Sequence, residues 1–89
     1  MDEIDDSWTP AAEDAATESA VLQQVLALHP IQVTLPELVR EIGGESPSFG
    51  VRDGIERAVR DLTGVGLLHG GGLIAPTHAA LRFSELLDR

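Results

Sequence analysis

Helix start and stop signals follow one another closely in the middle of the chain, and they allow few arrangements of the backbone. Thr34 and Glu37 form a capping box, in which Thr34 caps a helix and Glu37 reaches back to it. Gly43-Gly44 ends that helix, and Ser48 is placed to cap a second one. The sequence therefore predicts two helices separated by a short turn.

A glycine-centred hairpin is expected after the second helix, which is predicted over residues 49–63. Gly70-Gly71-Gly72 separates two short apolar segments, residues 66–69 and 73–75, and Pro76 ends the second of them. Thr77 then caps a last helix. The apolar spacing of that helix predicts an inner face made of Ala79, Ala80, Phe83, Leu86 and Leu87.

A further helix precedes these elements and ends at His29-Pro30, because the residue before a proline disfavours the helical region. The helix is clearly predicted from about Thr17, and its start can extend back to Thr9-Pro10, where Thr9 would be the cap. Residues 31–33 alternate apolar and polar and are consistent with a short strand. Across the chain, the side chains expected to be buried are Leu26, Leu38, Val39, Ile55, Val59, Leu62, Leu68, Ile74 and Phe83.

The chain is long enough for one small domain, since it has 89 residues of which 43% are hydrophobic. We expect residues 1–8 to be a disordered acidic tail and residues 9–89 to form a mainly α domain with a small β-hairpin. The chain has no cysteine, so disulfides and thiolate metal sites are excluded. No apolar run is long enough to span a bilayer and no signal peptide is present, which predicts a cytoplasmic protein.

This order of elements resembles the winged helix-turn-helix superfamily of small bacterial transcriptional regulators. The resemblance lies in residues 34–39, residues 52–62 and the glycine, leucine-leucine and proline-threonine pattern of residues 64–77, and it covers roughly residues 19–87. It implies a fold of helix, short strand, two helices, a two-stranded wing and a last helix. It also implies a transcription regulator that binds double-stranded DNA, although many members of the superfamily bind proteins instead.

The candidate DNA-binding residues are cations on and near the second helix of the pair. Arginine can pair with phosphates or with a guanine edge. However, Asp53, Glu56 and Asp61 lie on the same helix at spacings that allow ion pairs, so a solvated helix that neutralises itself is the alternative. The candidate residues are Arg52, Arg57 and Arg60, with Ser48 and Arg40 beside them.

The expected wing has no lysine or arginine for phosphate contacts, which supply most of the affinity for DNA. Its tip is His69, Gly70, Gly71 and Gly72. The net charge is −9, and residues 1–18 contain seven acids and no base. The alternative function is therefore a protein–protein interaction module with an acidic surface that does not bind DNA.

A homodimer is expected through the first and last helices, because the first is long and apolar and Leu81 lies opposite the predicted inner face of the last. The candidate interface residues are Val21, Val25 and Leu81. The alternative is a monomer in which Trp8 folds back over the core. The three histidines lack ligand spacing, and no serine has a catalytic base beside it, so we expect no metal, no cofactor and no enzymatic activity.

Overall fold

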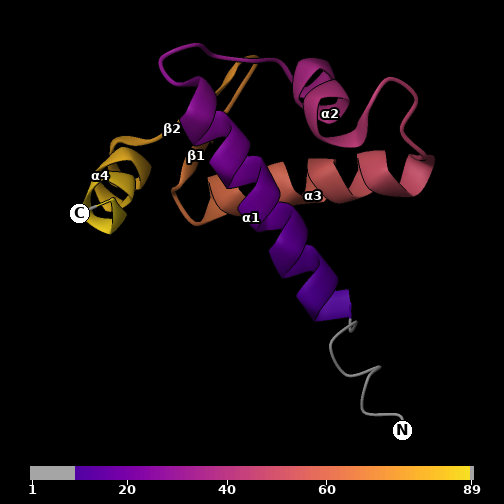
Figure 1. Ribbon diagram of the computed structural model, residues 1–89, viewed down its shortest axis with the longest axis horizontal. Helices are drawn as coiled ribbons and strands as arrows, with labels where there is room; N and C mark the ends of the chain where they lie inside the picture. Colours follow the sequence, from indigo (N-terminus) through magenta and orange to yellow (C-terminus); the bar gives the residue numbers. More distant parts are fainter. Residues whose placement is uncertain (1–9, 89) are drawn as a thin grey trace, which may run out of the picture.

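The computed structural model describes residues 10–88 and arranges them as four helices and one β-hairpin (Figure 1). This confirms a mainly α chain with a small antiparallel hairpin. The tail predicted at residues 1–8 and the predicted cap Thr9 lie outside the described residues. In chain order the elements are α1 (Pro10–Leu28), α2 (Leu35–Gly43), α3 (Phe49–Gly64), β1 (Leu68–Gly70), β2 (Ile74–Pro76) and α4 (His78–Leu87).

The capping box at the start of α2 has both of its hydrogen bonds. The backbone N–H of Glu37 donates to Thr34 Oγ1 at 3.3 Å, and the backbone N–H of Thr34 donates to Glu37 Oε1 at 2.8 Å. The helix ends at Gly44, whose φ of 89° lies in the left-handed region that favours glycine. Both boundaries of α2 are therefore set by the residues that predicted them.

The other two predicted caps are also present. Ser48 Oγ accepts the backbone N–H of Val51 at 3.2 Å, and Thr77 Oγ1 accepts that of Ala80 at 3.2 Å. The Thr77 hydroxyl also donates to the carbonyl of Gly66 at 2.7 Å. Thr77 thus starts α4 and fixes that start to the residues leading into the hairpin.

The hairpin lies later in the chain than the glycine pattern predicted. Leu68 pairs with Pro76, and Gly70 pairs with Ile74, so Gly70 belongs to a strand and not to the turn. Packing explains this, because a Cβ on Gly70 would lie 2.5 Å from Thr63 Oγ1 at the end of α3. Gly70 is thus needed for close approach of strand and helix, and the turn itself begins after it.

The short strand expected over residues 31–33 is reduced to one antiparallel bridge. Val33 exchanges both backbone hydrogen bonds with Ile74, at 3.2 Å and 2.6 Å. Ile31 remains 65% exposed. The chain between α1 and α2 therefore lies beside β2 at a single residue.

The core lies between α1, α2, α3 and the hairpin, with α1 and α3 as the most extensively packed pair. Most of the predicted core residues are buried, while Leu26 is only half-buried. The fully or nearly fully buried residues are Val21, Val25, Val33, Leu38, Val39, Ile55, Ala58, Val59, Leu62, Leu68, Ile74, Pro76 and Ala80.

The predicted inner face of α4 is confirmed at Ala80 and wrong at its other four residues. Phe83, Leu86 and Leu87 are 58%, 50% and 69% exposed, whereas Ala80 is buried and Leu81 is half-buried. The helix packs mainly on the three-residue strand β2 and lies at the side of the molecule, away from α2 (Figure 1). So short a strand covers little of the helix. The hydrogen bond from Thr77 to the Gly66 carbonyl fixes the start of α4, and the small Ala80 side chain is the one that faces inward.

Acidification should destabilise the protein partly through Glu37. The hydrogen bond from the Thr34 backbone, followed by that from its side chain, lowers the pKa of Glu37. A carboxyl with a lowered pKa in the folded state contributes stability above its unfolded pKa, and this contribution is lost as the pH falls through the folded pKa. We expect Glu37→Gln, which keeps an acceptor but does not titrate, to lose less stability than the wild type on acidification. Urea melts between about pH 6 and pH 3 check this, and parallel curves for the two proteins would contradict it.

Burial predicts opposite outcomes for two large apolar residues. Leu62 is 5% exposed and Phe83 is 58% exposed. Leu62→Ala should lower the free energy of unfolding by about 2–5 kcal/mol because it leaves a cavity, whereas Phe83→Ala should cost less than about 0.5 kcal/mol. Denaturant melts of both variants measure this difference. Equal losses would show that Phe83 is packed against the core.

Candidate functional site

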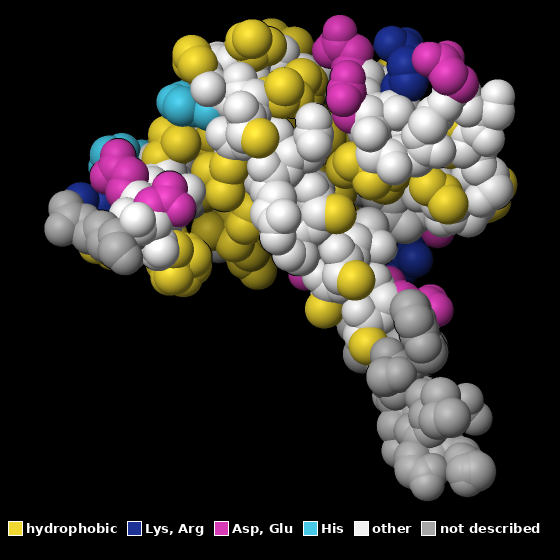
Figure 2. All heavy atoms as spheres, viewed as in Figure 1, with side chains coloured by type: hydrophobic (Ala, Val, Ile, Leu, Met, Phe, Trp, Pro, Cys, Tyr) yellow, Lys and Arg dark blue, Asp and Glu magenta, His cyan; other side chains and the backbone are white. Residues whose placement is uncertain are grey.

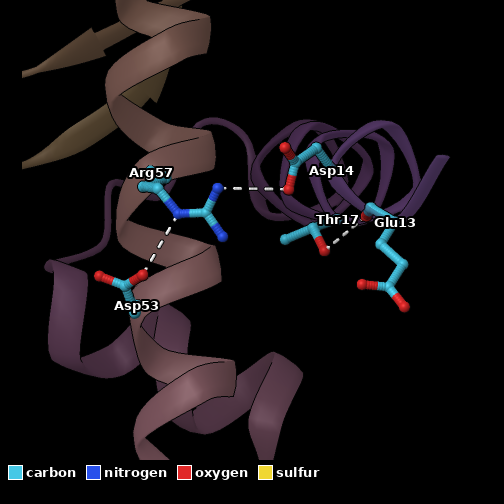
Figure 3. A network of polar contacts seen from close by, with 5 residues as sticks. All are labelled: Glu13, Asp14, Thr17, Asp53 and Arg57. Carbon is cyan, nitrogen blue, oxygen red and sulfur yellow. Dashed lines mark hydrogen bonds and ion pairs between the residues drawn. The ribbon is translucent and has the colours of Figure 1, made fainter. Parts of the chain in front are cut away.

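Arg57, at the centre of the predicted DNA-binding set, is held by two carboxylates (Figure 3). Its Nε donates to Asp53 Oδ2 at 3.2 Å on the same helix, and its Nη1 donates to Asp14 Oδ1 at 3.3 Å on α1. The charge of Asp14, followed by the hydrogen bond to Asp53, raises the pKa of Arg57 above its usual range. The pair with Asp53 was predicted from its i, i+4 spacing. The pair with Asp14 was not, because 43 positions separate the two residues.

The carboxylates occupy two of the directions from which a phosphate would approach the guanidinium. The side chains of Arg57 and Asp14 are 46% and 50% exposed, so both ion pairs are screened by solvent and add little to stability. Their effect is on the charge presented by α3. A phosphate that binds Arg57 would have to displace Asp14 or lie next to two negative groups.

Two other predicted arginines line a groove between α2 and α3. The groove has a volume of about 260 Å³ and contains Arg40 from α2 and Arg52 from α3, together with Glu45 and Glu56. Its apolar lining is Leu35, Pro36, Val39 and Pro47. The two arginines lie on a different side of α3 from the Arg57 cluster. The structure therefore brings Arg40 and Arg52 together and separates them from Arg57.

Arg60 lies one turn after Glu56 along α3 and extends the Arg52 edge of the helix. Within residues 10–88, none of Arg40, Arg52 and Arg60 has a carboxylate oxygen within 4.0 Å. These three side chains are therefore the cations of the predicted set that remain available to an anion. Arg57 does not join them in a continuous stripe of free arginines, because it is paired with Asp14 and Asp53.

Ser48 and the hairpin add little to a phosphate-binding surface. The Ser48 hydroxyl oxygen caps α3. His69 lies in β1 opposite Ala75, Gly70 lies against Thr63, and Gly71 and Gly72 follow in the turn. All four residues are exposed. The segment from residue 65 to residue 81 has no lysine or arginine.

The candidate interface residues are mostly part of the core. Val21 and Val25 are 0% and 1% exposed, so neither side chain can contact a second copy while the domain is folded. Leu81 is half-buried. The exposed apolar residues of α4 are instead Phe83, Leu86 and Leu87, and Figure 2 shows hydrophobic side chains at α4 and on the surface between α4 and α1.

A second groove, which was not predicted from the sequence, lies between α1 and α3. Its volume is about 480 Å³. It is lined by Glu13, Asp14, Ala16, Thr17 and Ala20 of α1, by Ile42 of α2, and by Gly50, Val51, Gly54, Ile55 and Arg57 of α3. Alanines and glycines at i, i+4 spacing on the two helices were a signal for it, but nothing in the sequence indicated that these two helices cross.

Residues 10–88 contain no group of three histidine, aspartate or glutamate side chains that could hold a metal ion. None of the helices described is both long enough and apolar enough to cross a membrane. No protein-family model matches the chain, and neither a curated protein nor a solved structure shows significant similarity to it.

Proposed function

We propose that this protein is a winged helix-turn-helix module that binds another protein, without catalysis and without binding duplex DNA. Two features support the winged-helix assignment. The first is the order of elements, with α2 and α3 joined by a short turn and followed by a hairpin. The second is the bridge between Val33 and Ile74, which puts the segment before α2 beside the hairpin. A winged-helix fold has a short strand at this position, paired with the wing.

The environment of Arg57 carries the functional part of the proposal. A helix that reads DNA needs cations toward a polyanion, since phosphate contacts supply most of the affinity. Here the central arginine of α3 already pairs with Asp14 and Asp53. The net charge of −9 adds long-range repulsion of DNA. The module therefore suits a protein partner better than it suits duplex DNA.

Titration with a duplex tests the proposal. A fluorescent duplex of about 20 bp should show no saturable change in anisotropy at about 20 mM salt, where charge–charge attraction is strongest. A saturable change that is lost in the double variant Arg52→Ala, Arg60→Ala would overturn the proposal. Arg82→Ala is the matched control, because Arg82 lies on α4 and pairs with Glu85 at 3.5 Å.

Regulation of transcription through DNA is the second candidate, and one observation favours it. Arg40, Arg52 and Arg60 have no described carboxylate within 4.0 Å, and Arg40 and Arg52 share one groove. Three phosphate contacts predict a salt slope of only about −3 per protomer. In the duplex titration, this candidate predicts weak binding with that slope and no contribution from Arg57.

Self-association stays a prediction. The surface available for it is the exposed apolar side of α4, since Val21 and Val25 of α1 are buried. Phe83 and Leu87 are one turn apart and both more than half exposed. If two copies meet at α4, the melting temperature should rise with protein concentration, and Phe83→Ser with Leu87→Ser should remove that rise. Sedimentation at high concentration provides the independent check. A monomer with a melting temperature independent of concentration would rule out the homodimer.

A further inference from the structure

The groove between α1 and α3 is open to solvent, and most of the residues that line it are apolar or small. Ile55 is 1% exposed and forms its most buried part, while Val51 remains 43% exposed along one wall. The one hydroxyl group on the α1 side is already satisfied, because Thr17 Oγ1 donates to the carbonyl of Glu13 at 3.0 Å. No helix or strand within residues 10–88 covers this surface.

Two glycines on the α3 side keep this surface open. Gly54 lies in the middle of α3, where glycine destabilises a helix relative to alanine. Packing within the domain does not require it, because a Cβ at Gly54 would meet no atom within 4 Å, and one at Gly50 would meet only Ser48 Oγ at 4.0 Å. The missing side chains therefore leave space for something outside the domain.

The charges around the groove are almost all negative. Glu13 and Asp14 line it, and Glu18 and Asp61 lie beside it next to Arg57. The one cation here, Arg57, is already paired with Asp14 and Asp53. An occupant must therefore bring positive charge as well as an apolar face.

We propose that the α1–α3 groove binds a basic amphipathic helix of a partner protein, with its apolar face over Gly50 and Gly54 and its cations near Glu13, Asp14 and Glu18. This deepens the proposed function and rests on it. Charge complementarity selects this occupant. Residues 1–9, which precede α1, have four acids and no base, and a second copy has a net charge of −9, so the acidic rim repels both.

A synthetic helix tests the proposal on the full-length protein. The probe is a peptide of about 16 residues with leucine on one face and lysine on the other, long enough for about four turns. Two peptides serve as controls, one with glutamate replacing lysine and one with serine replacing leucine. Amide chemical shifts of the protein report the place of binding, and anisotropy of the labelled peptide reports the affinity.

We expect saturable binding of the basic amphipathic peptide, with shifts confined to α1 and α3. Gly54→Leu should weaken it at least about tenfold by filling the groove, whereas Gly64→Leu, a glycine on the same helix that also faces open space, should leave it within about twofold. Glu13→Gln with Glu18→Gln should weaken it several-fold, and more at low salt. Circular dichroism verifies that each variant is folded.

The proposal is overturned if the peptide does not saturate, if its shifts fall on α4 or the hairpin, or if Gly54→Leu binds as tightly as Gly64→Leu. Equal binding of the serine-containing peptide would also overturn it, because charge alone would then explain the attraction. The outcome is separate from the duplex titration. DNA binding that depends on Arg52 and Arg60 would refute the proposed function, while a failed peptide titration alone would refute only this choice of partner.

Discussion

The packing of α1 across α3 holds the remainder of the molecule in place. Val21 and Val25, one turn apart on α1, are buried in the same core as Ile55, Val59 and Leu62 of α3. Only the second half of α1 takes part in this core, and the first half continues past it with most of its side chains exposed. The α1–α3 groove and the ion pair at Arg57 both exist because α1 is longer than the core it covers.

This crossing also decides what charge α3 presents. Asp14 reaches Arg57 only because the first half of α1 lies over that side of the helix. One side of α3 is thereby made acidic, while Arg52 and Arg60 lie on another side with no described carboxylate within 4.0 Å. The protein thus offers a negatively charged apolar groove and a weakly positive edge on one helix. The groove suits a basic protein segment, and the positive edge suits an anion. The edge has too few cations to bind a polyanion strongly.

The helix α4 packs against the rest of the domain much less extensively than α1 does. Its contact with the body is mainly through β2 and through Thr77, whose hydroxyl binds the Gly66 carbonyl. Ala80 is the one residue of α4 that is fully covered. The exposed Phe83, Leu86 and Leu87 are then an apolar surface on the outside of the domain, of the kind that usually marks a contact with another molecule.

The sequence by itself determined the features that depend on neighbours within about four residues. Thr34, Ser48 and Thr77 start their helices as predicted, and Gly44 ends α2, because caps act through local backbone hydrogen bonds. Most of the core followed as well, since one face of α2 and one of α3 are clearly apolar. The pairing of Asp53 with Arg57 was predictable for the same local reason.

Tertiary structure alone decided the rest. Phe83 and Ala80 both lie on apolar faces of α4, and only the short β2 strand beneath it determines which one is buried. The sequence predicted Gly70 as a turn residue, but it lies in β1, against Thr63 at the end of α3. Asp14 and Arg57 are 43 positions apart, and no local rule gives the angle at which α1 crosses α3. That angle follows from how the buried side chains of both helices fit together, which is a property of the whole core and not of any segment.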